Sequence, residues 1–120
     1  MSSITKETYN SGEFIFFEGD IEAHFYIIES GTVSIFTKNQ SGQKMILATL
    51  QPGDTFGEFA LIESGARTAS AMAETNVKLM KISQEGYDIM LNDLPLWASS
   101  MLKSFITRLK TMNTQLKIKK

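Results

Sequence analysis

The sequence predicts a mainly β domain, a sandwich or a barrel, with flanking helices and one long helix at its C-terminal end. Glycines interrupt the chain at short intervals from about Ser11 to Ile82, and β-rich runs lie between them. Short strands about 8–12 residues apart, with turn residues between them, are typical of a sandwich or a barrel. From Ser83 onward helix formers dominate, so the helices are expected to follow the β part.

Six β-rich runs are expected to form strands. In residues 32–37 apolar and polar side chains alternate with period two, as in a strand with one buried face. The other runs cover residues 14–17, 25–28, 45–50, 68–73 and 77–82. Five glycines between the runs are expected to adopt the positive φ of turns, which glycine tolerates best: Gly12, Gly19, Gly31, Gly42 and Gly53.

Two helices are expected after the strands. Ser83 is predicted to cap a short helix, because its hydroxyl can accept a hydrogen bond from the first turn and polar Gln84 and Glu85 follow it. This helix is expected to end near Asn92, since the sequence Asp-Leu-Pro comes next. Residues 96–117 contain neither glycine nor proline and predict one long helix.

The long helix carries a heptad pattern. Trp97, Met101 and Ile106 widen its apolar stripe, so one side is expected to pack on the β part. The seam predicts a homodimer through this helix, and packing of the same stripe on the chain's own β part is the alternative. The seam residues recur at alternating spacings of four and three: Ala98, Leu102, Phe105, Leu109, Met112 and Leu116.

A length of 120 residues fits one domain, with the β part at about 9–82 and the C-terminal helices at about 83–118. The net charge of −1 gives no reason to expect direct nucleic-acid binding, which usually needs a basic domain. No apolar run approaches the ~18 residues that span a bilayer, and residues 1–10 lack the apolar core of a signal peptide. The chain has no cysteine, which excludes disulfides and thiolate metal sites. We therefore expect a soluble cytoplasmic protein that does not contact a membrane.

Enzymatic activity is not expected. His24 is the only histidine, so the many Ser and Thr hydroxyls share a single candidate for their usual base. A metal site of the cupin type needs several His and Glu ligands, which one histidine cannot supply. His24 is interpreted as a surface residue at the start of a strand, and no catalytic residue, metal or cofactor is predicted.

Residues 56–70 combine groups that suit a small anionic ligand. Gly57 lets the backbone approach a ligand closely, and residues 59–62 can form one helical turn whose free N–H groups bind an anion. Arg67 offers a planar fork of donors for phosphate oxygens, and Glu58 can accept a hydrogen bond from a sugar hydroxyl. A ligand with both an anion and a hydroxyl would satisfy this set. The alternative is a salt bridge between Glu58 and Arg67 on a loop.

The same stretch resembles the phosphate-binding cassette of the cyclic-nucleotide-binding domain family, which includes the catabolite activator protein and the regulatory subunits of cyclic-AMP-dependent protein kinase. The matching segments are Gly57-Glu58-Phe59-Ala60-Leu61 and Arg67-Thr68-Ala69-Ser70, and the ten-residue spacing from Gly57 to Arg67 also matches. Further segments resemble the family in the same order, at residues 12–15, 18–20, 25–28, 30–33 and 52–58.

The resemblance implies a double-stranded β-roll, similar to a jelly roll, with a long C-terminal helix. It implies that Glu58 accepts a hydrogen bond from the ribose 2′-hydroxyl and that Arg67 pairs with the exocyclic phosphate oxygens. Backbone N–H groups of Ala60 and Thr68 would complete the phosphate cradle, and Gly57 would contact the ribose edge. The expected ligand-binding set is Gly57, Glu58, Phe59, Ala60, Arg67, Thr68, Ala69, Thr111 and Asn113.

The base is less strongly specified by these residues. Thr68 follows the arginine as in the cyclic-GMP-dependent kinases, yet the activator protein has serine there and binds cyclic AMP, so cyclic AMP is placed slightly ahead of cyclic GMP. Thr111 and Asn113 lie where the activator protein reads adenine, but Met112 stands where a threonine is expected. Ala66 replaces the usual proline before the arginine, which is expected to loosen the loop.

The predicted function is a cyclic-nucleotide-responsive regulatory module that signals through movement of its C-terminal helix. The alternative is a ligand-free β-roll that serves as a dimerisation or protein-interaction domain, and a cupin-type enzyme is a distant third. Because the chain ends with the long helix, it is expected to be a free-standing module or a fragment of a larger protein.

Overall fold

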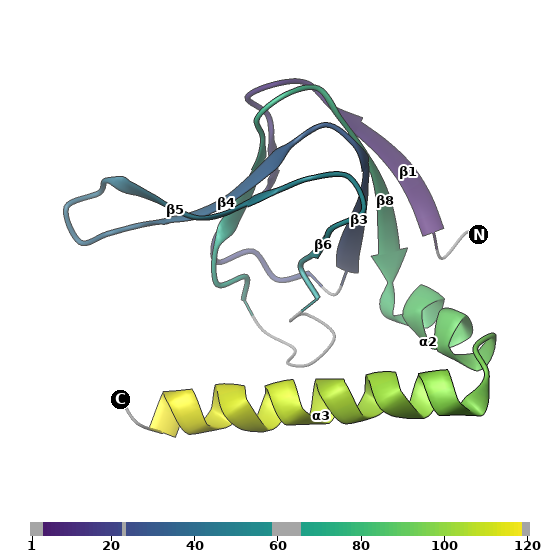
Figure 1. Cartoon of the computed structure of the whole chain (residues 1–120). Helices are drawn as coiled ribbons and strands as arrows, with labels where there is room; N and C mark the ends of the chain where they lie inside the picture. Colours follow the sequence, from purple (N-terminus) through teal and green to yellow (C-terminus); the bar gives the residue numbers. More distant parts are fainter. Residues whose placement is uncertain (1–3, 23, 59–65, 119–120) are drawn as a thin grey trace.

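Two four-stranded antiparallel sheets face each other in the computed structural model of the chain, which describes residues 4–22, 24–58 and 66–118 (Figure 1). The first sheet has the order β1 (Ile4–Tyr9), β8 (Val77–Ser83), β3 (His24–Ser30) and β6 (Thr55–Phe56). The second has the order β2 (Phe14–Phe16), β7 (Ser70–Ala73), β4 (Val33–Lys38) and β5 (Lys44–Leu50). Helices α2 (Gln84–Asn92) and α3 (Leu96–Ile118) follow β8. The predicted fold class, mainly β with flanking helices and a long C-terminal helix, is confirmed.

Two strands were not expected from the sequence. β1 pairs with β8 along its whole length, from Ile4 opposite Ile82 to Tyr9 opposite Val77. Its sequence, ITKETY, is mostly polar because it lies at the edge of the sheet, where charged residues also discourage pairing with another chain. β6 has only two residues, too few to show a period. β1 and β6 are the two edge strands of the first sheet.

The core lies between the two sheets. Strand β4 is more buried than its alternating pattern predicts, because both of its faces are covered. On the face away from the core, Ser34 donates a hydrogen bond to Glu74 Oε1 at 2.7 Å, and Phe36 packs beneath Phe14 and Lys44. The buried core cluster is Ile15, Phe16, Tyr26, Ile28, Val33, Phe56, Ala71, Ala73, Val77 and Leu79.

The two described helices begin and end close to the predicted residues. Ser83 caps α2, since its hydroxyl accepts a hydrogen bond from the Gly86 N–H at 3.1 Å. α3 runs beside the β part with much of its apolar stripe exposed (Figure 1). Trp97 is 70% exposed and Met101 49%, so the expectation that they pack on the β part is wrong for these two side chains. No helix in the described ranges is long and apolar enough to cross a membrane.

The five predicted turn glycines all adopt positive φ. Gly31, in the turn between β3 and β4, has φ of +89° and also lies in a tight space. A Cβ added there would collide with the carbonyl oxygen of Asn76 and lie 2.8 Å from Val77 Cγ2. Gly42, at the tip of the β4–β5 hairpin, has φ of +80° but nothing within 4 Å of an added Cβ. The two positions therefore separate backbone strain from steric exclusion.

We expect Gly31→Ala to lower the free energy of unfolding by about 2–5 kcal/mol, because backbone strain and overpacking add at this position. Gly42→Ala is the matched control and should cost only about 1–2 kcal/mol, from the backbone alone. Urea unfolding followed by circular dichroism measures both values. Equal losses in the two variants would show that the contact with Asn76 is relieved without cost.

Candidate functional site

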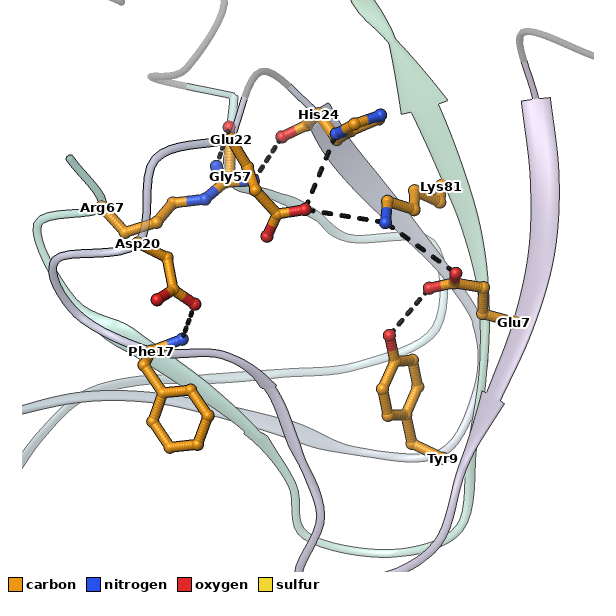
Figure 2. A network of polar contacts seen from close by, with 9 residues as sticks. All are labelled: Glu7, Tyr9, Phe17, Asp20, Glu22, His24, Gly57, Arg67 and Lys81. Carbon is orange, nitrogen blue, oxygen red and sulfur yellow. Dashed lines mark hydrogen bonds and ion pairs between the residues drawn. The ribbon is translucent and has the colours of Figure 1, made fainter. Parts of the chain in front are cut away.

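The guanidinium of Arg67 lies at the centre of the candidate site. Arg67 as a whole residue is only 7% exposed. Nη1 donates to the carbonyl oxygen of Gly57 at 2.9 Å, and Nη2 donates to the carbonyl oxygen of His24 at 2.7 Å (Figure 2). The buried Nε has no hydrogen-bond partner. Arg67 thus links the chain after β6 to the first residue of β3, and it does so through backbone carbonyls.

An aromatic floor holds the guanidinium from one side. Arg67 Cζ lies 4.2 Å from the centre of the Phe16 ring and 6.0 Å from that of Tyr26. The Tyr26 ring stacks on Phe56 at 5.0 Å, because these residues are opposite each other in the β3–β6 pair. A cation over an aromatic face is attracted by the negative face of the ring. Burial raises the pKa of Tyr26 well above its ordinary value, so its phenol stays neutral beside the guanidinium.

Gly57 permits the close approach of Arg67. Its φ is +78°, and an added Cβ would lie 2.9 Å from Arg67 Nη1 and 3.4 Å from the His24 carbonyl oxygen. The sequence predicted a glycine that lets the backbone approach a ligand. In this structure the group that approaches Gly57 is the side chain of Arg67.

Glu58 follows Gly57 but does not pair with Arg67. Its half-buried carboxylate accepts a hydrogen bond from the Thr55 hydroxyl at 2.9 Å. Both members of the predicted Glu58–Arg67 salt bridge are described, and each has other partners. That alternative is therefore wrong for this structure, and the carboxylate and the guanidinium are held separately.

The backbone around Arg67 is held by the turn between β2 and β3. The Arg67 N–H donates to the Asp20 carbonyl at 2.7 Å, and the Gly19 N–H donates to the Arg67 carbonyl at 2.9 Å. Asp20 in turn accepts a hydrogen bond from the Phe17 N–H at 2.9 Å through its carboxylate (Figure 2). Residues 18–20, which resemble a segment of the family, thus hold the backbone of Arg67 in place through these hydrogen bonds.

The remaining predicted site residues are spread over three locations. Thr68 is exposed and Ala69 is buried, and both lie just before β7. Phe59 and Ala60 lie outside the described residues. Thr111 is on α3, where its hydroxyl donates to the Thr107 carbonyl at 3.0 Å. Asn113 is also on α3, and its side chain lies outside the described part. In that part of the chain no hydrogen bond joins Thr111 to Glu58 or Arg67.

A polar network beside the site was not predicted. Lys81 Nζ lies 3.6 Å from Glu22 Oε1 and 3.9 Å from Glu7 Oε2, and Glu22 is also 3.8 Å from His24 Nδ1 (Figure 2). The His24 backbone carbonyl is the one that receives Arg67 Nη2. These residues come from β1, the loop before β3, and β8, so no local pattern in the sequence could have brought them together.

His24 begins β3 as predicted, but its side chain is half-buried and its Nδ1 is buried without a hydrogen-bond partner. The interpretation of His24 as a surface residue is therefore corrected. Burial lowers the pKa of His24, and the neighbouring Lys81 lowers it further, while Glu22 opposes them. The neutral imidazole is the form that the fold favours.

We expect the stability of the fold to fall as the pH drops through the ordinary histidine value of about 6.5, because the unfolded chain then binds a proton at His24 that the folded chain resists. Above that pH this contribution is fully present. Urea unfolding at pH 7.5 and 5.5 should show a larger loss for the wild type than for His24→Gln, which cannot titrate. The same pH dependence in both proteins would contradict the assignment.

Comparison with known proteins identifies the family. The family model described as cyclic nucleotide-binding domain matches residues 6–93, which is most of the chain. The chain belongs to the cyclic nucleotide-binding domain family. The resemblance of residues 56–70 to the family's phosphate-binding cassette therefore lies within a match that also covers both sheets and α2.

One curated protein and two solved structures illustrate the similarity. The cyclic AMP receptor protein of Thermus thermophilus is 34% identical over 116 residues, which are 97% of this chain and 54% of that protein. The crystal structure of Thermus thermophilus catabolite activator protein superimposes with a TM-score of 0.76 at 33% identity, covering 97% of this chain and 55% of that one. A half-site-occupied structure of the EAL enzyme Bd1971 gives a TM-score of 0.83 at 28% identity, covering 91% of this chain and 97% of the other.

These matches confirm the double-stranded β-roll with a C-terminal helix and the function of a cyclic nucleotide-binding regulatory domain. The chain spans about half the length of the receptor protein. The similarity to an EAL enzyme shows that such a domain also occurs in a protein named as an enzyme.

Proposed function

We propose that this domain binds a cyclic nucleotide, with cyclic AMP favoured, through the guanidinium of Arg67 and the carboxylate of Glu58. The observation that carries the proposal is the buried guanidinium, which no carboxylate neutralises among the described residues. In the polar network beside it, the carboxylates of Glu22 and Glu7 pair with Lys81. A buried charge without an opposite charge is costly, and a bound anion would remove that cost.

The free donors of Arg67 suit a phosphate. A guanidinium has five N–H donors, and carbonyls in the described part of the chain take one on Nη1 and one on Nη2, so three have no partner among those residues. Charge-assisted hydrogen bonds from arginine to phosphate oxygens are stronger than those to neutral carbonyls. An exocyclic phosphate would therefore compete well for this side chain. Backbone N–H groups of Ala60 and Thr68 would complete the cradle, as the family resemblance implies.

Glu58 is the proposed partner of the sugar. Among the described residues its carboxylate accepts a hydrogen bond from Thr55 alone, and a carboxylate has acceptor capacity for a further donor such as a ribose 2′-hydroxyl. The preference for cyclic AMP is supported by the name of the similar cyclic AMP receptor protein. Thr68 is exposed, and its hydroxyl could serve a guanine, so cyclic GMP is the second ligand to be measured. Thr111 and Asn113 on α3 remain the proposed contacts of the base.

We expect Arg67→Gln to weaken the binding of cyclic AMP by about 2–5 kcal/mol, because the variant removes the charge that the phosphate would meet in a desolvated site. Isothermal titration calorimetry measures the dissociation constant. Lys38→Gln is the matched control, since it removes one positive charge from an exposed position at the end of β4.

Unchanged affinity in a folded Arg67→Gln protein would overturn the role of Arg67. A wild type that binds neither cyclic AMP nor cyclic GMP would favour the other hypothesis, a ligand-free β-roll that serves as an interaction domain. The proposed module has no catalytic step of its own, and its cytoplasmic location stays a prediction.

A homodimer through α3 is the proposed assembly. The described seam residues other than Ala98 are exposed, from 41% for Leu102 and Leu109 to 57% for Met112. This exposure argues against the alternative in which the seam packs on the chain's own sheets. A helix of 23 residues gains most of its stability in water from packing, so two such helices would bury each other's seam. Ligand would signal by favouring one arrangement of this helix over another.

We expect the wild type to sediment as a dimer at micromolar concentration, and a Leu109→Glu, Met112→Glu double variant to sediment as a monomer. Two acidic residues in each seam would be buried against each other and would repel. Analytical ultracentrifugation measures both. A monomeric wild type would refute the dimer, whereas a dimeric double variant would place the interface elsewhere.

A further inference from the structure

The carboxylate of Glu58 is held by a hydrogen bond from a hydroxyl of the same short segment. Thr55 Oγ1 donates to Glu58 Oε2 at 2.9 Å, across the two residues that separate them. The bond uses one lone pair of one oxygen, and no hydrogen bond to Oε1 comes from the residues that the structure describes. A glutamate side chain has three rotatable bonds, and ordering it on binding would reduce affinity. The threonine hydroxyl removes part of that cost before any ligand arrives.

Thr55 can act in this way because its own backbone is fixed. It is the first residue of β6 and lies opposite Ile27 in β3, while the next residue, Phe56, is 3% exposed in the core. A β-branched side chain has few χ1 rotamers, so a fixed backbone also restricts where its hydroxyl points. The hydroxyl is therefore a better anchor for Glu58 than a flexible side chain at the same position.

The same short segment fixes both binding groups separately. The carbonyl of Gly57 accepts the hydrogen bond of Arg67 Nη1, while the Thr55 hydroxyl holds Glu58. The carboxylate could otherwise turn toward the nearby guanidinium and neutralise it, and the hydroxyl gives it another partner. Thr55 thus keeps the acceptor for the sugar apart from the donor for the phosphate.

We infer that Thr55 is a positioning residue that sets the preference of this site for ribose over 2′-deoxyribose ligands by orienting Glu58. The inference rests on the proposed role of Glu58 as the acceptor of the 2′-hydroxyl. It adds a second determinant of sugar selectivity to Glu58.

Calorimetric titration of cyclic AMP and 2′-deoxy cyclic AMP tests the inference. Thr55→Val keeps the β-branched shape and replaces the hydroxyl by a methyl group, so it should weaken cyclic AMP binding about two- to tenfold, because the carboxylate is oriented less well but is still present. Binding of the deoxy ligand should stay unchanged. Thr55→Ser keeps the hydroxyl and should retain the wild-type ratio of the two affinities. In a Glu58→Ala background, Thr55→Val should no longer change that ratio.

Two results would overturn the inference alone. One is an equal loss for both ligands in Thr55→Val, which would make Thr55 a purely structural residue. The other is an unchanged ratio in that variant while Glu58→Ala does change it. A wild type that binds both ligands equally would instead overturn the role proposed for Glu58, and the inference with it. A wild type that binds neither would overturn the proposed function itself.

Discussion

The placement of the Arg67 guanidinium on two backbone carbonyls is the interaction on which the site depends. These carbonyls belong to Gly57, which follows the edge strand β6, and to His24, the first residue of the inner strand β3. The guanidinium also covers the Phe16 ring, which belongs to the second sheet. The side chain of Arg67 therefore contacts both sheets and the segment that follows β6. The glycine at position 57, with its positive φ, leaves room for the guanidinium, because an added Cβ would lie 2.9 Å from Arg67 Nη1.

This arrangement explains how a charged residue can be so well buried without an ion pair to any carboxylate of the described residues. Carbonyl dipoles and an aromatic face each provide partial negative charge, but neither cancels a full positive charge. The residual field is available to a ligand. Functional sites are often less favourable for stability than they could be, and a buried guanidinium with an unbonded Nε fits that description.

Sequence patterns predicted the parts of the fold that depend on local chemistry. Alternation identified β4, the hydroxyl of Ser83 identified the start of α2, and the spacing from Gly57 to Arg67 pointed to the family that the comparison then showed. Patterns failed where the determinant is a distant neighbour. β1 is polar and becomes a strand because β8 offers it an edge, and the half-buried His24 lies 3.8 Å from Glu22, which also pairs with Lys81 of β8. The partners of Arg67 are backbone atoms, which no residue type reveals.

The low exposure of Arg67 has a consequence for kinetics. A ligand cannot reach a residue that is 7% exposed by collision alone, because the guanidinium must first turn away from at least one carbonyl or its surroundings must open. Association that requires this opening is slower than the diffusion limit. A bound ligand leaves slowly for the same reason, because the site must open again to release it. A sensor built in this way would average the concentration of its ligand over time and would pass over brief fluctuations.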